Sequence, residues 1–467
     1  MKNHIVTLLF FLLTYCLITC TPVPKAANMM ETALVTAFPD WSKNANIYEV
    51  NIRQYTPEGT IKAFHEQHLQ RLKTMGVDIL WLMPIFPISE TKRKGNLGSY
   101  YAVSSFRRIN PEFGTMADVD ALIQKAHELG MKIILDWVPN HTGWNHEWIT
   151  AHPDYYTHKN GQITDPLNPK TGESEGWTDV ADLNYDNPAM REAMIADLLY
   201  WVKEKKVDGF RMDIAYGVPL DFWQQCIPAL RKANPELFLL AEAELPEHQQ
   251  SDSLFTMNYA WTLHHRLNAI AQGKDSLEAL DRWYAEEKPK FPKGYLMHFI
   301  TNHDENSWAG TEQERMKDAV DAMAVLAFTF DGMPLIYSGQ EEPLTKRLQF
   351  FEKDLIEWKT YSKQDFYAKL LALKHRNQAL WNGEKGGKIT RVVTNNNKNI
   401  YAYYREQTGD RVLVILNLSN EAQTAILQAS QCEGTYNNLF LGNSMTVTNG
   451  QTIHLKAWDY LVLELQK

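Results

Sequence analysis

Three acidic residues stand at the ends of short apolar segments, and their side chains are suited to proton transfer and nucleophilic attack. The segments GFRMD, LLAE and ITNHD end at Asp213, Glu242 and Asp304. A carboxylate can attack an electrophilic carbon, and a carboxylic acid can give its proton to a leaving group. A lone acidic residue at a strand end is more often a cap or a surface charge, so the spacing of the three decides whether they act together.

The spacing of these carboxylates matches a parallel (β/α)8 barrel, in which the C-terminal ends of the strands carry the working groups. Asp213 and Glu242 are separated by about one βα unit, and Glu242 and Asp304 by about two, at about 30 residues per unit. Equivalent strand ends can therefore bring the three together. Two carboxyl groups about 5 to 5.5 Å apart are what retaining glycoside hydrolysis requires, one as nucleophile and the other as acid and then base.

The residues around each carboxylate suggest different roles. Arg211 shares a strand face with Asp213, and a permanent cation favours the ionised form that a nucleophile needs. The apolar run 238–243 surrounds Glu242, and partial burial would raise its pKa as a proton donor requires. Glu244 lies on the same strand face as Glu242, so the residues alone leave it open as the acid.

A repeated pattern of elements supports the barrel. From residue 46 the chain alternates short β-branched or aromatic runs with longer stretches of helical periodicity, which indicates a parallel α/β architecture. Eight strands close a TIM barrel. They are expected within residues 47–55, 77–86, 132–140, 209–213, 238–243, 255–259, 295–303 and 333–339.

Several helices between these strands carry start and stop signals. Thr115 can cap a helix with Asp118 at its third position and Gly130 beyond its last turn, and Asn187-Pro188 begins another. Apolar residues at helical spacing predict the buried faces. The expected stripes are Ile61, Phe64, Leu69, Leu72 and Met75 before the second strand, and Met116, Val119, Ile123 and Ala126 before the third.

Two further regions differ from the barrel pattern. Residues 141–187 are rich in Asn, Gly, Pro, Thr and Trp and are too long for an ordinary βα loop, which predicts a subdomain inserted over the active face after the third strand. From residue 382 short alternating strands follow, including 399–405, 411–418 and a hairpin at Asn449-Gly450. The catalytic TIM barrel is therefore expected over 41–381 and a C-terminal antiparallel β-sandwich over 382–467.

The N-terminus predicts export. Lys2 precedes an apolar run at residues 5–18 that is too short for a membrane span, as in a signal peptide over 1–19. The segment LITC resembles a bacterial lipoprotein cleavage box, so Cys20 is expected to carry the lipid and residues 20–40 to form a tether. The predicted location is the bacterial periplasm or outer membrane. Ordinary secretion, with Cys20 incidental, is the alternative.

The net charge and the cysteine content bear on the possible partners and on disulfide bonding. The formal net charge is -9, and no sustained Lys/Arg run occurs in the mature region, which argues against a nucleic-acid partner. Cys226 and Cys432 remain once Cys16 and Cys20 are assigned to the signal and the lipid. Their wide separation predicts two buried thiols, with a disulfide between them as the alternative in an oxidising compartment.

The motifs resemble those of the α-amylase family of glycoside hydrolases, also called glycoside hydrolase family 13. Four short regions occur in the family's order: DWVPNH ending at His141, and the segments ending at Asp213, Glu242 and Asp304. The resemblance includes Tyr101 and extends from about residue 41 to the end of the chain. Ala241 stands where many members have glycine, a small change.

The resemblance implies roles for individual residues. Asp213 corresponds to the nucleophile, Glu242 to the general acid/base, and Asp304 to the carboxylate that grips sugar hydroxyls as positive charge develops. Asp136 resembles a support residue. The expected substrate contacts are Tyr101, which stacks beneath the sugar, and His141, Arg211 and His303.

The implied activity is retaining hydrolysis of starch-type α-glucans or maltooligosaccharides through a covalent glycosyl-enzyme intermediate. An α-glucan transglycosylase with the same carboxylates, or a non-catalytic glucan-binding protein, are the alternatives.

No cofactor is required for the chemistry, although the resemblance allows a structural calcium ion at Asn140. The segment IAYGVP after Asp213 lacks the Lys-His of many endo-acting amylases, which puts the calcium histidine and the leaving-group contacts in doubt. Trp144, Trp148 and Trp177 are candidate sugar platforms or core residues.

Overall fold

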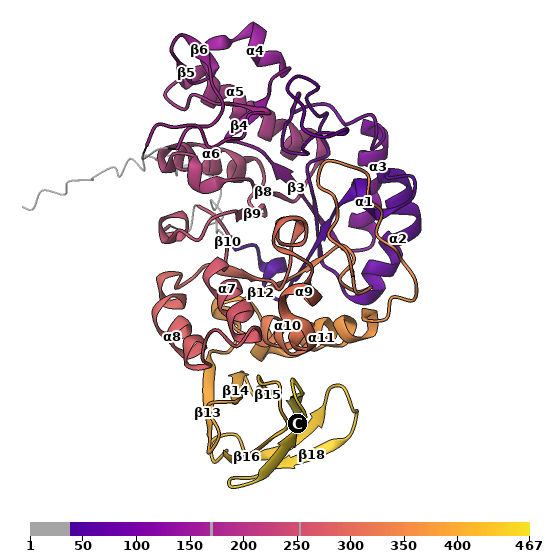
Figure 1. Ribbon diagram of the computed structural model, residues 1–467, viewed down its shortest axis with the longest axis vertical. Coiled ribbons are helices and arrows are strands. Elements are labelled where there is room, and N and C mark those ends of the chain that lie inside the picture. The colour runs from indigo at the N-terminus through magenta and orange to yellow at the C-terminus, as the bar shows by residue number, and fades with distance from the viewer. Residues whose placement is uncertain (1–37, 169–170, 252–253) are drawn as a thin grey trace, which may run out of the picture. The chain divides into compact units, whose positions relative to one another are not determined.

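The computed structural model describes residues 38–168, 171–251 and 254–467 (Figure 1). The predicted signal peptide, the lipid site at Cys20 and the tether up to residue 37 lie outside these residues. Among the helices that are described, none is long and apolar enough to span a membrane. The domain limits at residues 41, 381 and 382 stay predictions.

Eight parallel strands form a closed barrel, as the alternating pattern predicts. Neighbours in the barrel follow the order of the chain, and the last strand pairs with the first to complete the ring. Each strand lies inside one of the eight expected runs. They are β1 (Ile47–Val50), β2 (Ile79–Leu82), β3 (Lys132–Trp137), β8 (Gly209–Met212), β9 (Phe238–Ala241), β10 (Met257–Tyr259), β11 (Tyr295–His298) and β12 (Met333–Tyr337).

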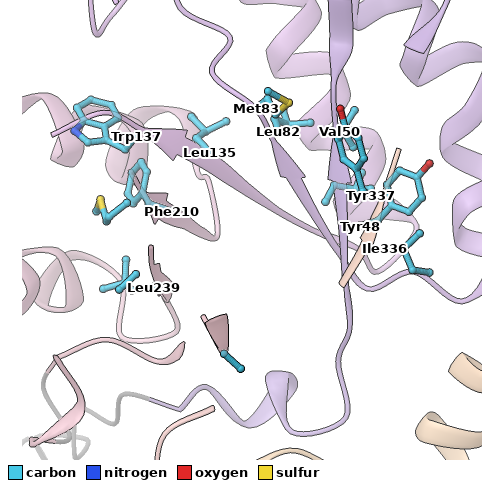
Figure 2. Packing of buried hydrophobic residues seen from close by; sticks show 14 of the residues in the cluster. Tyr48, Val50, Leu82, Met83, Leu135, Trp137, Phe210, Leu239, Ile336 and Tyr337 are labelled. Atoms are coloured by element: carbon cyan, nitrogen blue, oxygen red, sulfur yellow. The ribbon is translucent and has the colours of Figure 1, made fainter. Parts of the chain in front are cut away.

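The pleat of these strands divides their side chains between two layers. One layer packs against the surrounding helices, and Figure 2 shows Leu135, Phe210 and Leu239 as members of it on three neighbouring strands. The other layer fills the barrel with residues such as Ile47, Ile79 and Phe238. Polar residues that point inward at the C-terminal ends of neighbouring strands therefore lie close together. The candidate site is built at this end of the barrel.

The helices cover the barrel as the apolar stripes predict. The five stripe residues of α2 (Ile61–Met75) are buried. In α3 (Met116–Glu128) Thr115 and Asp118 form the predicted capping box, but Met116 is half-buried and Leu122 completes the buried face instead. This shift of the stripe follows from the 3.6-residue turn, since Leu122 lies three residues from Val119 on the same face. The other helices are α1 (Ile52–Tyr55), α4 (Glu147–Ala151), α5 (Pro188–Tyr200), α6 (Leu220–Ala233), α7 (Trp261–Ala271), α8 (Glu278–Glu286), α9 (Glu312–Met316), α10 (Val320–Thr329) and α11 (Gln364–Arg376).

The insertion after β3 forms two small antiparallel ladders. β4 (His141–Gly143) pairs with β7 (Val180–Asp182), and β5 (His158–Lys159) pairs with β6 (Gln162–Ile163). Figure 1 shows β5, β6 and α4 grouped together. Because β4 begins at His141, this ladder fixes the residue that follows the DWVPN segment.

The C-terminal region is an antiparallel sandwich with its own core, as expected. The prediction of a hairpin at Asn449-Gly450 is wrong. The turn exists, but β18 pairs with β17 and β19 with β16, so it joins strands at the two ends of the strand order. Gly450 N–H donates to Leu427 on β16, which directs the chain away from β18. The strands are β13 (Ile389–Thr394), β14 (Ile400–Gln407), β15 (Asp410–Asn417), β16 (Gln423–Gln428), β17 (Gly434–Asn438), β18 (Ser444–Val447), β19 (Thr452–Leu455) and β20 (Tyr460–Leu465).

The two cysteines within the described residues are free and buried, Cys226 in α6 and Cys432 after β16. The prediction of two buried thiols is confirmed, and they do not form a disulfide.

Candidate active site

The buried guanidinium of Arg211 holds three carboxylates together at the end of the barrel. Its Nη1 lies 2.8 Å from Asp213 Oδ1 and 2.9 Å from Asp136 Oδ1, and its Nη2 lies 2.9 Å from Glu242 Oε1. Asp136 and Arg211 are register partners on neighbouring strands, which explains their contact. The structure thus brings together Asp213 and Glu242, as their spacing predicted.

Glu242 has a second partner that sequence reasoning missed. The backbone N–H of Ile214 donates to Glu242 Oε2 at 2.7 Å. Glu244, which the residues alone left open as the acid, instead accepts hydrogen bonds from the Thr262 backbone and hydroxyl at the start of α7. Glu244 does not line the cavity that Asp213 and Glu242 border. The geometry therefore favours Glu242 over Glu244.

A second chain of contacts joins Asp304 to the barrel interior. His303 Nε2 lies 3.2 Å from Asp304 Oδ2 and 2.8 Å from the Tyr101 hydroxyl, and His303 Nδ1 lies 2.5 Å from Glu49 Oε1. The Tyr101 hydroxyl donates to Asp136 Oδ2 at 3.0 Å. Both groups of carboxylates therefore belong to one network through Tyr101.

Glu49 is a site residue that the sequence analysis missed. It is fully buried on β1 and faces His303 inside the barrel. The available signal was an acidic residue within the apolar run IYEV of the first strand. Buried carboxylates require a partner, so such a residue predicts a cation or a hydrogen-bond donor nearby.

The predicted residues surround one cavity of about 420 Å³. Six of the seven line it, and Arg211 does not; its fully buried side chain lies against the carboxylates instead of in the cavity wall. The lining residues are Lys94, Ser99, Tyr101, His141, Trp177, Asp179, Val180, Asp213, Ile214, Tyr216, Glu242, His303, Asp304, Trp308, Phe350 and Phe351.

The three candidate tryptophan platforms have different positions. Trp177 lines the cavity, with its ring centroid 6.1 Å from that of His141. Trp148 is buried against Phe106 and is a core residue. Trp144 does not line the cavity, and the Lys92 ammonium lies 3.2 Å from its ring centroid. The cavity contains other aromatic residues that the sequence analysis did not single out.

The electrostatics of Asp213 differ from the sequence-based expectation. Burial raises the pKa of Asp213 well above its ordinary value, Arg211 acts in the opposite direction, and the negative charge of Glu242 adds to the rise. Arg211 was expected to dominate, but it is fully buried and is shared among three carboxylates. Retention requires one of two neighbouring carboxyl groups as nucleophile and the other as acid and then base.

The histidines of the site are held in different charge states. Burial opposes the charge of His303, but the carboxylates of Asp304 and Glu49 raise its pKa well above the ordinary value. Burial acts to raise the pKa of Asp304, yet His303 and Arg211 lower it overall, so Asp304 is ionised. Burial lowers the pKa of His141 to about 4. His141 is thus a neutral hydrogen-bonding residue near neutral pH.

Asn140 is the position at which the family resemblance allows a structural calcium ion. The side-chain amide nitrogen of Asn140 lies 3.3 Å from His141 Nδ1, and the Asn140 carbonyl accepts from Leu183 N–H. In the described part of the chain, no three or more His, Cys, Asp or Glu side chains come together in a metal-binding arrangement. Calcium prefers six to eight oxygen ligands, which include carboxylates, carbonyl groups and water.

Family models match nearly all of the described chain. The model of the α-amylase catalytic domain matches residues 38–411, and that of the α-amylase SusG C-terminal domain matches residues 400–462. A maltogenic α-amylase from Thermotoga neapolitana, AmyB, has a similar crystal structure: the TM-score is 0.80 at 28% identity, over 91% of this chain and 100% of that one.

Sequence relatives include hydrolases and a transferase. The α-amylase MalA of Haloarcula japonica is 27% identical over 402 residues, which are 84% of this chain; the chain spans 58% of that protein's length. The α-1,4-glucan:maltose-1-phosphate maltosyltransferase of Bifidobacterium longum is 35% identical over 201 residues, 40% of this chain and 26% of the relative. On the catalytic-domain match and the closed barrel, the chain belongs to the α-amylase family of glycoside hydrolases.

Proposed function

We propose that this protein hydrolyses α-glucosidic bonds in starch-type glucans or maltooligosaccharides with retention of configuration, using Asp213 as nucleophile and Glu242 as acid and base. The single observation that carries this proposal is the shared contact of both carboxyl groups with Arg211 beside one cavity. That arrangement supplies the neighbouring pair on which retention depends.

Asp213 has one carboxylate oxygen available for attack. Arg211 holds Oδ1, whereas the buried Oδ2 has no hydrogen-bond partner within the described residues. In the proposed first step, Asp213 attacks the anomeric carbon of the bound sugar and forms a glycosyl ester. Glu242 gives its proton to the departing glycosidic oxygen, which leaves as a hydroxyl group.

The second step releases the product. Glu242, now ionised, takes a proton from water, and the water oxygen attacks the anomeric carbon as the Asp213 carboxylate departs. Asp304 is ionised beside protonated His303 and lines the cavity, so it is placed to bind sugar hydroxyls while positive charge develops on the ring. The Tyr101 ring supplies an apolar surface for the sugar in the same cavity.

Product analysis tests this function. Purified wild-type protein is incubated with maltooligosaccharides, isomaltooligosaccharides, pullulan and soluble starch, with Asp213→Asn as the matched inactive control. Shorter sugars from the wild type alone support the proposal and identify the linkage. Folded wild-type protein that cleaves no α-glucoside would contradict it, and retained binding without cleavage would then indicate a glucan-binding protein.

Transglycosylation is the second candidate function. It is favoured by the resemblance to a maltosyltransferase over 201 residues and uses the same covalent intermediate. An acceptor sugar would replace water in the second step. Products longer than the substrate, formed by the wild type and absent with Asp213→Asn, would identify transfer.

Export and lipidation are part of the proposal. They are supported by the apolar run after Lys2 and by the LITC segment that ends at Cys20. Expression of the full chain in a bacterium with labelled fatty acid should label the wild type and leave Cys20→Ala unlabelled. Equal labelling of both, or of neither, would contradict the lipid anchor.

Structural calcium stays an open prediction from the family resemblance. If an ion binds at Asn140, chelation should lower the melting temperature of the wild type, and added Ca²⁺ should restore it. Asn140→Ala should remove that response. An unchanged melting temperature in the wild type would mean that the fold does not depend on calcium.

A further inference from the structure

The residues that line the catalytic cavity are unevenly distributed around the barrel. They come from the segments that follow β2, β3, β8, β9, β11 and β12, and no described residue from 243 to 302 lines the cavity. β10 lies between β9 and β11 in the ring, and only Ala260 joins it to α7. This connection is too short to form a wall, so the cavity has an open side beside β10.

The other side of the ring carries a short segment that reaches the insertion after β3. This segment is residues 92–98 of the loop between β2 and α3, and we call it the strap. Lys94 Nζ lies 2.9 Å from Asp179 Oδ1 in the insertion, and both residues line the cavity. The Lys92 ammonium lies 3.2 Å from the centroid of the Trp144 ring, also in the insertion. Two cations therefore hold the strap to this wall.

The strap also contacts the segment that follows β12. The Leu97 N–H donates to the Phe351 carbonyl at 3.0 Å. The backbone and side-chain amides of Asn96 each donate to the Glu352 carboxylate at 2.9 Å. Hydrogen bonds to a charged acceptor are stronger than neutral ones. Since Phe351 lines the cavity, the strap connects two parts of the cavity wall.

A buried cation and a close approach fix the strap in place. Arg53, which follows β1 and is 2% exposed, donates from Nη1 to the carbonyl groups of Gly98 and Phe350 at 3.2 and 3.3 Å. A Cβ atom on Gly95 would overlap the Cβ atom of Phe351. β12, β1, β2 and β3 are consecutive in the ring. The cavity is therefore closed along this arc and open beside β10.

The proposed reaction orients a glucan between these two sides. Glu242, at the end of β9, protonates the leaving oxygen, so the leaving part of the chain continues towards the open side. The sugar that Asp213 attacks then lies between Glu242 and the strap. Because the anomeric carbon of that sugar points to the reducing end of the chain, its non-reducing end faces the strap.

We propose that the strap closes the cavity at the non-reducing end of the substrate, so that the enzyme removes short saccharides from chain ends. Lys94 and Asp179 then determine this specificity. The cavity volume of about 420 Å³ is near the lower limit for ligand pockets, which have about 300 to 1,000 Å³, and accommodates only a short segment. The inference rests on the proposed function and extends it to the position of the cleaved bond in the chain.

End-modified maltoheptaoses test the closed end in the wild type. One carries a 4,6-ethylidene group on its non-reducing glucose, and another is reduced to the alditol at its other end. Relative to unmodified maltoheptaose, kcat/KM should fall at least about tenfold for the ethylidene substrate and change less than about twofold for the alditol. Similar values for the ethylidene and unmodified substrates, or a larger loss with the alditol, would overturn the proposal.

The double variant Lys92→Ala/Lys94→Ala tests the strap itself. It removes both cations that contact the insertion, so the ratio of kcat/KM for the ethylidene substrate to that for unmodified maltoheptaose should rise about three- to tenfold. Lys125→Ala is the matched control, because it removes a 3.2 Å ion pair with Glu128 on α3 and does not line the cavity. Its ratio should equal that of the wild type.

The outcomes distinguish this inference from the proposed function. An unchanged ratio in the double variant would overturn the role of the strap, while wild-type activity would still support the function. A wild type that cleaves none of the maltoheptaoses would overturn both. If the double variant does not fold, Asp179→Asn removes the charge that holds Lys94 and keeps the side-chain shape, and the same rise in the ratio is expected.

Discussion

At the scale of single residues, the site is organised by two cations that are buried among carboxylates. Arg211 contacts Asp136, Asp213 and Glu242, and His303 contacts Glu49 and Asp304. Buried charges are costly unless they are paired, so each carboxylate is held where its cation requires. The positions of the reacting groups therefore depend on these two buried cations.

Glu49 provides a direct test of this dependence as a positioning residue. Glu49→Gln removes the charge that faces His303 Nδ1 at 2.5 Å, and a hydrogen bond to a charged group is worth about 1.5 to 3 kcal/mol. We expect kcat to fall by about 10- to 100-fold with little change in KM, because Asp304 loses its fixed protonated partner during the reaction. Steady-state kinetics at several pH values provide the measurement.

The pH profile distinguishes positioning from simple loss of packing. Glu49 raises the pKa of His303, so its removal lowers that pKa, and His303 loses its proton at a lower pH. The alkaline limb of the kcat profile should therefore move to lower pH in Glu49→Gln. Glu49→Asp keeps the charge and should move it less. An unchanged profile in Glu49→Gln would show that Glu49 does not act through His303.

At the scale of elements, β4 of the inserted subdomain packs closely against the loop between β2 and α3. Gly143 N–H donates to the Val103 carbonyl at 2.7 Å. A Cβ atom on Gly143 would lie 2.3 Å from Ser89 Cβ and 2.7 Å from the Ala102 carbonyl oxygen. Gly143 ends β4, which begins at His141, so this contact also fixes a residue of the cavity wall.

Substitution of Gly143 should disturb both stability and catalysis. Gly143→Ala forces the insertion and the loop apart, and overpacking of this kind costs about 1 to 3 kcal/mol. We expect a lower melting temperature and a lower kcat/KM because His141 moves with β4. The measurements are thermal unfolding and maltotetraose cleavage.

Gly161→Ala is the matched control for Gly143→Ala. Its Cβ atom would meet nothing within 4 Å, and its φ of 77° adds only a backbone penalty. It should leave kcat/KM near the wild-type value. If Gly143→Ala retained wild-type stability and activity, the close approach would have no role in holding the site.

The elements of the barrel could be predicted from the sequence because each carries its own periodicity and caps. The strand runs and the capping box at Thr115 depend on neighbouring residues alone. The turn at Gly450 could be predicted too, but not the partners of β18 and β19, because strand pairing in a sandwich depends on distant residues. For the same reason Glu49 and Lys94 were missed, since their importance depends on contacts with distant parts of the chain.

At the scale of the whole molecule, buried histidines couple stability to pH. Burial lowers the pKa of His68, His141 and His248 to about 4 and that of His146 and His298 to about 3, from an ordinary 6.5. In the unfolded chain these histidines bind protons below about pH 6.5, whereas in the folded chain they do not until lower pH. The unfolded state thus gains stability as the pH falls.

The predicted consequence is a loss of stability in mild acid. The melting temperature should fall as the pH decreases from about 6.5 towards about 4, in the window set by these pKa values. His298 is 1% exposed, and its burial is the largest cause of its lowered pKa. His298→Met should therefore flatten the fall of melting temperature with pH, and the same slope in both proteins would contradict the role of His298.

The proposed reaction requires Asp213 to form a covalent bond to the sugar, which intact-protein and peptide mass spectrometry can detect. The protein is incubated with 5-fluoro-α-glucosyl fluoride, whose ring fluorine slows the second step, and is then digested. One added fluoroglucosyl group is expected on the peptide that contains Asp213, and none in Asp213→Asn. A label on Glu242 or Asp304, or active wild-type enzyme that turns over the reagent without any covalent adduct, would contradict it.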